Sequence, residues 1–169
     1  TKIVFKLIPL PTKDISLLVP FNSSEKACEA VSAVFRAGIT PSALEFIERD
    51  AIDWTKKYSD IELNIDDDVK AHLLVEVDGN DLERLYKECE HIFEVMQEFD
   101  CGEILLADSE IQKNSLWKLR RSVGEAVKSN SIYKEEDTVV PRAELAKLLK
   151  GVKVIGKAYG FNSVCYGHA

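Results

Sequence analysis

The chain of 169 residues lacks long apolar runs, and none approaches the roughly 18 residues that a membrane-spanning helix requires. Its beginning also lacks the basic flank, apolar core and cleavage site of a secretory signal peptide. Basic residues are in the minority, since 22 Lys and Arg stand against 29 Asp and Glu, for a net charge of −7. This balance argues against sequence-independent nucleic-acid binding, which needs a basic surface. We therefore expect a cytoplasmic protein with no transmembrane segment and no nucleic-acid partner.

Cysteine and glycine are scattered, which argues against two further kinds of site. The four cysteines form no Cys-x-x-Cys pair, and we expect reduced thiols rather than a structural disulfide. The glycines are isolated, so the chain has no glycine-rich loop to bind the phosphates of a cofactor. Met96 is the only methionine, and we therefore expect that Thr1 is not a native translation start.

The composition is globular, with 46% hydrophobic and 30% charged residues. Apolar runs at 15–20 and 72–77 are each followed by an amphipathic helix and by a second apolar run, at 43–48 and 103–108. Asn22 is the expected N-cap of the first helix. This repeated order predicts an α+β fold, a ferredoxin-like βαββαβ antiparallel sheet with its helices on one face.

Further elements are expected around this core. They are a short helix in the connection at 49–57, additional C-terminal helices at 109–128 and from Pro141, and two terminal strands at 2–8 and 163–166. Because no Pro-rich or Gly-rich linker divides the chain, residues 1–169 are expected to form a single domain.

Arg120 is a candidate for binding an anionic ligand. A planar guanidinium forms two parallel bonds to a carboxylate, and Trp117, three residues earlier, is expected to wall the same pocket. The alternative is a solvated helix face with a basic edge, formed by Arg120 and Arg121. Glu45 lies inside an apolar strand, where a carboxylate needs a partner, so it indicates either a structural ion pair or a site.

The three histidines differ in their surroundings. His72 lies in an apolar strand and His91 on the polar side of a helix, and both are interpreted as packed or surface residues because neither has ligand spacing. His168 follows Gly167 at a strand end, where loops bring functional groups into clefts. Composition and spacing alone leave the function open.

Four short motifs occur in a distinctive order, at 41–46 (PSALEF), 116–120 (LWKLR), 137–142 (DTVVPR) and 166–169 (YGHA). Together they resemble the C-terminal part of FAD-linked 2-hydroxy-acid oxidases and dehydrogenases, a group that includes the glycolate oxidase flavoprotein subunit and D-lactate dehydrogenase. The resemblance covers nearly the whole chain. It implies the substrate (cap) domain of a larger flavoprotein, excised from a flavin domain that binds FAD outside this chain.

The resemblance also assigns roles to particular residues. Arg120 matches the arginine that holds the substrate carboxylate, and His168 matches the first metal-binding histidine. The second motif histidine and a later glutamate are absent, so a divalent metal, Zn or Mn, is expected only in the full-length parent. As the penultimate residue, His168 is expected to be frayed and its ring to lack an orienting partner.

Two departures from the family pattern concern the substrate. Gly124 stands where relatives that bind longer diacids have Thr, and Glu135, next to Lys134, stands where some relatives have a substrate-contacting Lys. Both departures favour a small acid. The resemblance therefore implies FAD-dependent oxidation of a small D-2-hydroxy acid, glycolate or D-lactate, to the 2-oxo acid.

Two alternatives differ in class from this enzyme. One is a ferredoxin-like ligand-binding or regulatory module without a redox role, because such sheets host many functions. The other is a purely structural domain, in which Arg120 would be paired internally.

Apolar patches left by excision would favour association into a homo-oligomer.

Overall fold

The computed structural model describes residues 2–59, 61 and 65–169 of the chain. The described residues form β1 (Lys13–Phe21), α1 (Ser24–Arg36), β2 (Ala43–Glu48), α2 (Arg49–Ser59), β3 (Ala71–Gly79), α3 (Leu82–Gln97), β4 (Leu105–Ala107), α4 (Glu110–Asn130), α5 (Leu145–Tyr159) and β5 (Tyr166–His168). A 3₁₀ turn at Arg142–Glu144 leads into α5. No helix in this part of the chain is both long and apolar enough to cross a membrane.

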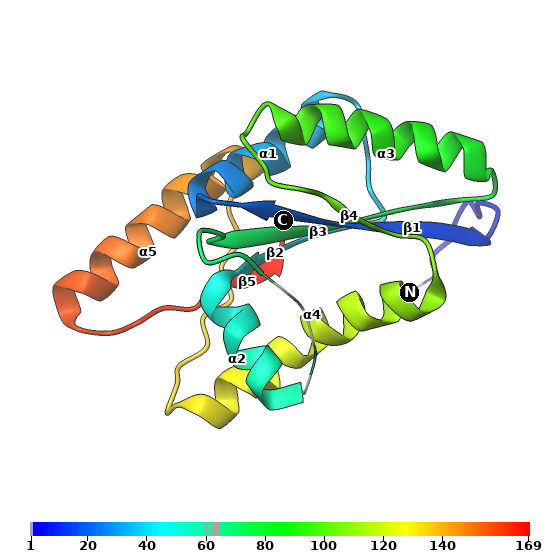
Figure 1. Cartoon of the computed structure of the whole chain (residues 1–169). Coiled ribbons are helices and arrows are strands. Elements are labelled where there is room, and N and C mark those ends of the chain that lie inside the picture. Colours follow the sequence, from blue (N-terminus) through cyan, green and yellow to red (C-terminus); the bar gives the residue numbers. More distant parts are fainter. Residues whose placement is uncertain (1, 60, 62–64) are drawn as a thin grey trace.

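The strands form one sheet in the order β4-β1-β3-β2-β5, and every neighbouring pair is antiparallel (Figure 1). The order of β1 to β4 is the one that two interleaved strand–helix–strand units produce. The predicted α+β fold is therefore confirmed. The strand expected at 43–48 has the predicted bounds, whereas the one expected at 103–108 is shorter and spans Leu105–Ala107.

The sheet is covered on both faces. On β1, Ile15 and Leu17 pack into the larger core, which they share with α1, α3 and α5. Leu18 points to the opposite face and packs against Leu116 of α4, and α2 joins α4 on that face (Figure 1). The prediction of helices on one face thus holds for α1 and α3, while α2 and α4 add a layer that it did not include.

Three local predictions are wrong. The strand expected at 163–166 lies at Tyr166–His168, the residues that pair with β2. The N-cap of α1 is Ser23 and not Asn22, because Ser23 directly precedes the helix and its Oγ accepts a hydrogen bond from the Lys26 N–H at 3.3 Å. Residues 2–8 form no strand, and Phe5 and Leu7 among them are 75% and 87% exposed. Alternating apolar residues form a strand only beside a hydrogen-bonding neighbour, and residues 2–8 pair with no strand of the sheet.

The end of α5 includes a close approach of two backbone segments. Gly160 adopts a left-handed conformation at φ 73°, and the Phe161 N–H donates to the Gly156 carbonyl oxygen at 3.0 Å. A Cβ atom on Gly156 would lie 2.7 Å from the Phe161 carbonyl oxygen. In the same helix, a Cβ atom on Gly151 would have no described atom within 4 Å apart from its chain neighbours and the backbone of its own helix.

Alanine substitutions at these two glycines are expected to have opposite effects. Gly151→Ala should raise the free energy of unfolding by about 0.5–1 kcal/mol, because alanine loses less backbone entropy in a helix. Gly156→Ala should lower it by about 1–3 kcal/mol, since the added methyl group must displace backbone. Urea denaturation of both variants measures the difference, and equal changes would contradict the close approach.

Candidate functional site

Helix α4 crosses the second face of the sheet, and its successive turns meet successive strands. The contacts are Lys113 with Asp14 of β1, Trp117 with Glu76 of β3, Arg120 with Glu45 of β2, and Gly124 beside Tyr166 of β5. A helical turn rises about 5.4 Å and neighbouring strands lie about 4.8 Å apart, so a spacing of three or four residues keeps step with the sheet. This register decides which strand residue each α4 side chain meets.

Glu45 lies at the centre of the candidate site and is 3% exposed. Because side chains alternate along β2, Leu44 and Phe46 face the larger core while Glu45 faces α4. Opposite Glu45 in the antiparallel register is His168 of β5. The carboxylate is thus held between a helix residue and a strand residue that come from distant parts of the chain.

Arg120 forms an ion pair with Glu45. Its Nε donates to Glu45 Oε2 at 2.9 Å, and its Nη2 lies 2.8 Å from the same oxygen. The Arg120 side chain is 16% exposed, so the opposite charges compensate each other largely out of water. Among the described residues, the Nη1 end of the guanidinium has no hydrogen-bond partner.

His168 is held by the second oxygen of the same carboxylate. Its Nδ1 lies 2.5 Å from Glu45 Oε1, while the side chain as a whole is 88% exposed. The Ala169 N–H also donates to the Leu44 carbonyl oxygen at 2.9 Å. The expectation of a frayed histidine without an orienting partner is therefore wrong, because pairing of β5 with β2 continues to the last residues.

Tyr166 is the aromatic residue beside Arg120. Its ring centre lies 5.6 Å from Arg120 Cζ, within the range of a cation–π contact. Burial raises the pKa of the Tyr166 phenol, with Glu135 adding to the effect, so the side chain stays neutral. A Cβ atom on Gly124 would lie 3.7 Å from Tyr166 Oη, so a larger residue at this position would contact the phenol.

Trp117 lies one turn earlier on α4, at β3 rather than β2. Its indole N–H donates to Glu76 Oε2 at 2.6 Å, and Ser16 Oγ lies 3.1 Å from that oxygen. The cation over its ring is Arg121, with Cζ 5.5 Å from the ring centre. The structure therefore brings together Arg120 and His168, and places Trp117 in a neighbouring contact.

Two surface hollows lie elsewhere on the chain. One, of about 420 Å³, is lined by the starts of α1 and α2, including Arg49, and by Lys153 of α5. The other, of about 560 Å³, lies between α3 and β4 and includes Tyr86 and Phe93. The described residues also contain no group of three or more His, Cys, Asp or Glu side chains that could hold a metal ion.

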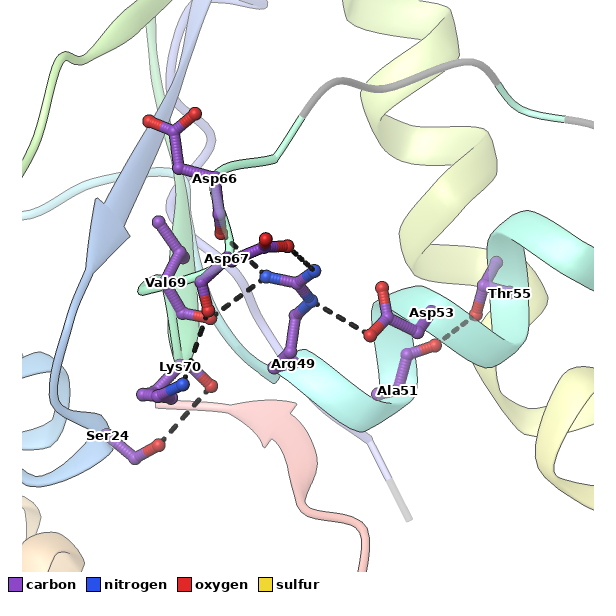
Figure 2. A network of polar contacts seen from close by, with 9 residues as sticks. All are labelled: Ser24, Arg49, Ala51, Asp53, Thr55, Asp66, Asp67, Val69 and Lys70. Atoms are coloured by element: carbon purple, nitrogen blue, oxygen red, sulfur yellow. Dashed lines mark hydrogen bonds and ion pairs between the residues drawn. The ribbon is translucent and has the colours of Figure 1, made fainter.

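The residues that meet at the candidate site, called the Glu45 cluster below, are Glu45, Arg120, Tyr166 and His168. The other two histidines lie away from this cluster, as expected for packed or surface residues. His91 is exposed on α3, whereas His72 is 3% exposed on β3. Burial lowers the pKa of His72 to about 4, and the cation of Arg49 adds to the effect. Arg49 is fixed by Asp53 and by backbone carbonyl oxygens of the following loop (Figure 2).

The sequence predicts two residues of the Glu45 cluster, Arg120 and His168, as site residues. The sequence indicates either an ion pair or a site for Glu45, and it assigns no role to Tyr166. The available signal was the inward position of Glu45 between Leu44 and Phe46, because a charge there needs an opposite charge. The identity of that partner depends on the register of α4 over the sheet.

Comparison with known proteins identifies the family of the chain. Residues 10–169 match the family model described as FAD linked oxidases, C-terminal domain. The whole chain is 30% identical to a D-lactate dehydrogenase of Anaerostipes hadrus and to the glycolate oxidase subunit GlcD of Bacillus subtilis (strain 168), of which it covers 37% and 36%. It thus spans a little over a third of the length of these relatives.

A solved structure supports the fold. The structure of an alkyldihydroxyacetonephosphate synthase matches 87% of this chain and 31% of its own, with a TM-score of 0.59 and 14% identity. The resemblance drawn from the four sequence motifs is confirmed by the family match. The chain therefore belongs to the family of FAD linked oxidases and corresponds to their C-terminal domain.

Proposed function

We propose that residues 1–169 are the single substrate (cap) domain of a larger FAD-dependent oxidoreductase that oxidises a small D-2-hydroxy acid, glycolate or D-lactate, to the 2-oxo acid. The names of the two relatives support this substrate class. The partner of the domain is then the flavin domain of the same protein.

The observation that carries this proposal is the state of the Arg120 guanidinium. Glu45 Oε2 accepts from Nε and lies 2.8 Å from Nη2, and among the described residues Nη1 has no hydrogen-bond partner. A guanidinium has five N–H donors, so the Nη1 end remains able to bind a second carboxylate. We propose that this end anchors the carboxylate of the hydroxy acid, with Trp117 further along the same helix face as a second substrate contact.

The residues of the chain contribute binding and orientation. FAD, when bound, supplies the acceptor for the hydride that leaves C2 of the substrate. Arg120 would fix the carboxylate, and a fixed carboxylate limits the orientations of the adjoining C2. The absence of a larger side chain at Gly124 is consistent with a small acid, although a Cβ there meets only Tyr166 Oη.

We also propose that His168 supplies one ligand to a divalent metal, Zn or Mn, in the longer protein. Glu45 occupies Nδ1, so Nε2 is the nitrogen that remains for a ligand. Because the described residues hold no cluster of three metal ligands, we assign no step of the reaction to a metal.

The internal pairing of Arg120 is also what a purely structural role requires, so the test must separate the two. In the flavoprotein that contains this chain, Arg120→Lys should raise KM for the acid and lower kcat/KM about 10- to 150-fold, the equivalent of one charge-assisted hydrogen bond of about 1.5–3 kcal/mol. Lysine keeps the charge but loses the planar fork.

Arg121→Lys is the matched control. Arg121 is the next residue of the same helix, and it is exposed and contacts Trp117 rather than Glu45. Steady-state kinetics with glycolate and D-lactate should distinguish the two variants. Kinetics of Arg120→Lys equal to those of the control would remove Arg120 from the site and leave its ion pair as structural.

A further inference from the structure

Both oxygens of the buried Glu45 carboxylate are used, and each serves a different residue of the cluster. Oε2 accepts from Arg120, and Oε1 lies 2.5 Å from His168 Nδ1. An ion pair that served only to compensate a buried charge would need the arginine alone. The second contact reaches a ring that is 88% exposed and gains little from burial.

We propose that Glu45 is a positioning residue, which holds the Arg120 guanidinium and the His168 ring in one relative orientation and sets which histidine nitrogen bears the proton. The use of this orientation for substrate binding rests on the proposed function. The fixed orientation itself is a property of this chain and can be measured without substrate, flavin or metal.

Hydrogen-bond chemistry decides the form of His168. An ionised carboxylate accepts but does not donate, so the proton between the two groups belongs to His168 Nδ1. In a neutral imidazole, the nitrogen opposite the donor is bare. Glu45 therefore favours the tautomer in which Nδ1 bears the hydrogen and Nε2 presents its lone pair to solvent.

The fold makes this orientation specific. Glu45 and His168 are opposite each other in the β2–β5 register, and the Ala169 N–H bond to Leu44 extends the pairing beyond them. Arg120 reaches the carboxylate from α4 on the other side. The three groups come from three different elements. The Glu45 carboxylate contacts both of the others, and it therefore links Arg120 to His168.

Replacing Glu45 with glutamine is the sharpest test because the substitution keeps the shape and changes the donors. Arg120 can only donate, so the oxygen of the introduced amide should turn toward Arg120. The NH₂ group of that amide then faces His168 Nδ1, which must become an acceptor. Glu45→Gln should therefore move the proton of His168 from Nδ1 to Nε2.

Glu48→Gln is the matched control. Glu48 is 6% exposed in the same strand, but it lies on the opposite face of the sheet. Its Oε2 accepts from Lys153 and from the Cys165 N–H at 2.8 and 2.9 Å. This variant removes a comparable buried charge without touching Arg120 or His168.

The measurement is a long-range ¹H–¹⁵N correlation spectrum of the histidine-labelled chain, at an alkaline pH at which its imidazoles are neutral. We expect the Nδ1–H tautomer of His168 in the wild type and in Glu48→Gln, and the Nε2–H tautomer in Glu45→Gln. A predominant Nε2–H form in the wild type, or an unchanged tautomer in Glu45→Gln, would overturn the proposal. The wild-type spectrum alone suffices if Glu45→Gln does not fold.

Kinetics of the flavoprotein separate this proposal from the proposed function. Loss of an orienting partner should lower kcat/KM about 10- to 100-fold in Glu45→Gln. A tautomer change in Glu45→Gln with normal kinetics in both Glu45→Gln and Arg120→Lys would reject the function and retain the positioning role. An unchanged tautomer with impaired Arg120→Lys would reject the positioning role and retain the function.

Discussion

Arg120→Leu is expected to lower the free energy of unfolding of the chain by about 3–5 kcal/mol. Glu45 is 3% exposed, and Arg120 is the one permanently charged side chain that pairs with its carboxylate among the described residues. The substitution removes this cation and leaves the carboxylate buried. A buried charge that loses its partner retains the cost of leaving water but not the attraction that offset it. Urea unfolding at neutral pH, followed by circular dichroism, measures this loss.

Two further variants show whether the loss comes from the charge. Arg121→Leu removes a cation over an aromatic ring on the exposed side of the same helix, and should cost at most about 1 kcal/mol. The double variant Glu45→Leu with Arg120→Leu should recover most of the stability, because a buried ion pair can often be replaced by apolar residues. A double variant as unstable as Arg120→Leu would show that packing, and not the unpaired carboxylate, causes the loss.

Acid is expected to destabilise the chain through His72. Its pKa in the fold is about 4, against an ordinary value of 6.5. Between these two values the unfolded chain binds a proton that the folded chain does not bind, so stability falls as the pH falls. The contribution is complete above about pH 6.5 and is lost by about pH 4, and it amounts to about 3 kcal/mol for a shift of this size.

The pH dependence of unfolding in His72→Leu isolates this contribution. The variant should lose about 3 kcal/mol less stability than the wild type between pH 7 and pH 4, whatever its stability at pH 7. His91→Leu is the control, because it removes a histidine that is exposed on α3 and leaves His72 in place. Parallel curves for the wild type and His72→Leu would show that His72 is protonated equally easily in both states.

The order of strands and helices could be predicted because each element has its own local signal. Apolar runs predicted β2 with its observed bounds, and helical periodicity predicted the amphipathic helix α3 between β3 and β4. The second helical layer also had a signal, since the run from Ile15 to Phe21 is apolar at nearly every position. Such a run is typical of a strand buried on both faces, whereas strict alternation is typical of one exposed face.

The contacts of the site could not be predicted from local signals. Helical spacing correctly puts Trp117 and Arg120 on one face of α4, but it does not show that the helix crosses from β3 to β2 between them. For the same reason Tyr166, rather than Trp117, is the ring at Arg120. The pairing of Glu45 with His168 depends on a strand register across 123 positions of sequence.

The separation of 123 residues between Glu45 and His168 also determines when the contacts of Glu45 can form during translation. Strands β1 to β4 are complete once residue 107 has been made, yet Glu45 still waits for Arg120, 75 residues after it, and for His168, 123 residues after it. At about 5–20 residues per second, the interval to His168 is roughly 6–25 s. A nascent chain that closed β2 against its neighbours earlier would bury an unpaired carboxylate. The face of β2 that bears Glu45 should therefore stay open to water on the ribosome until α4 and β5 arrive.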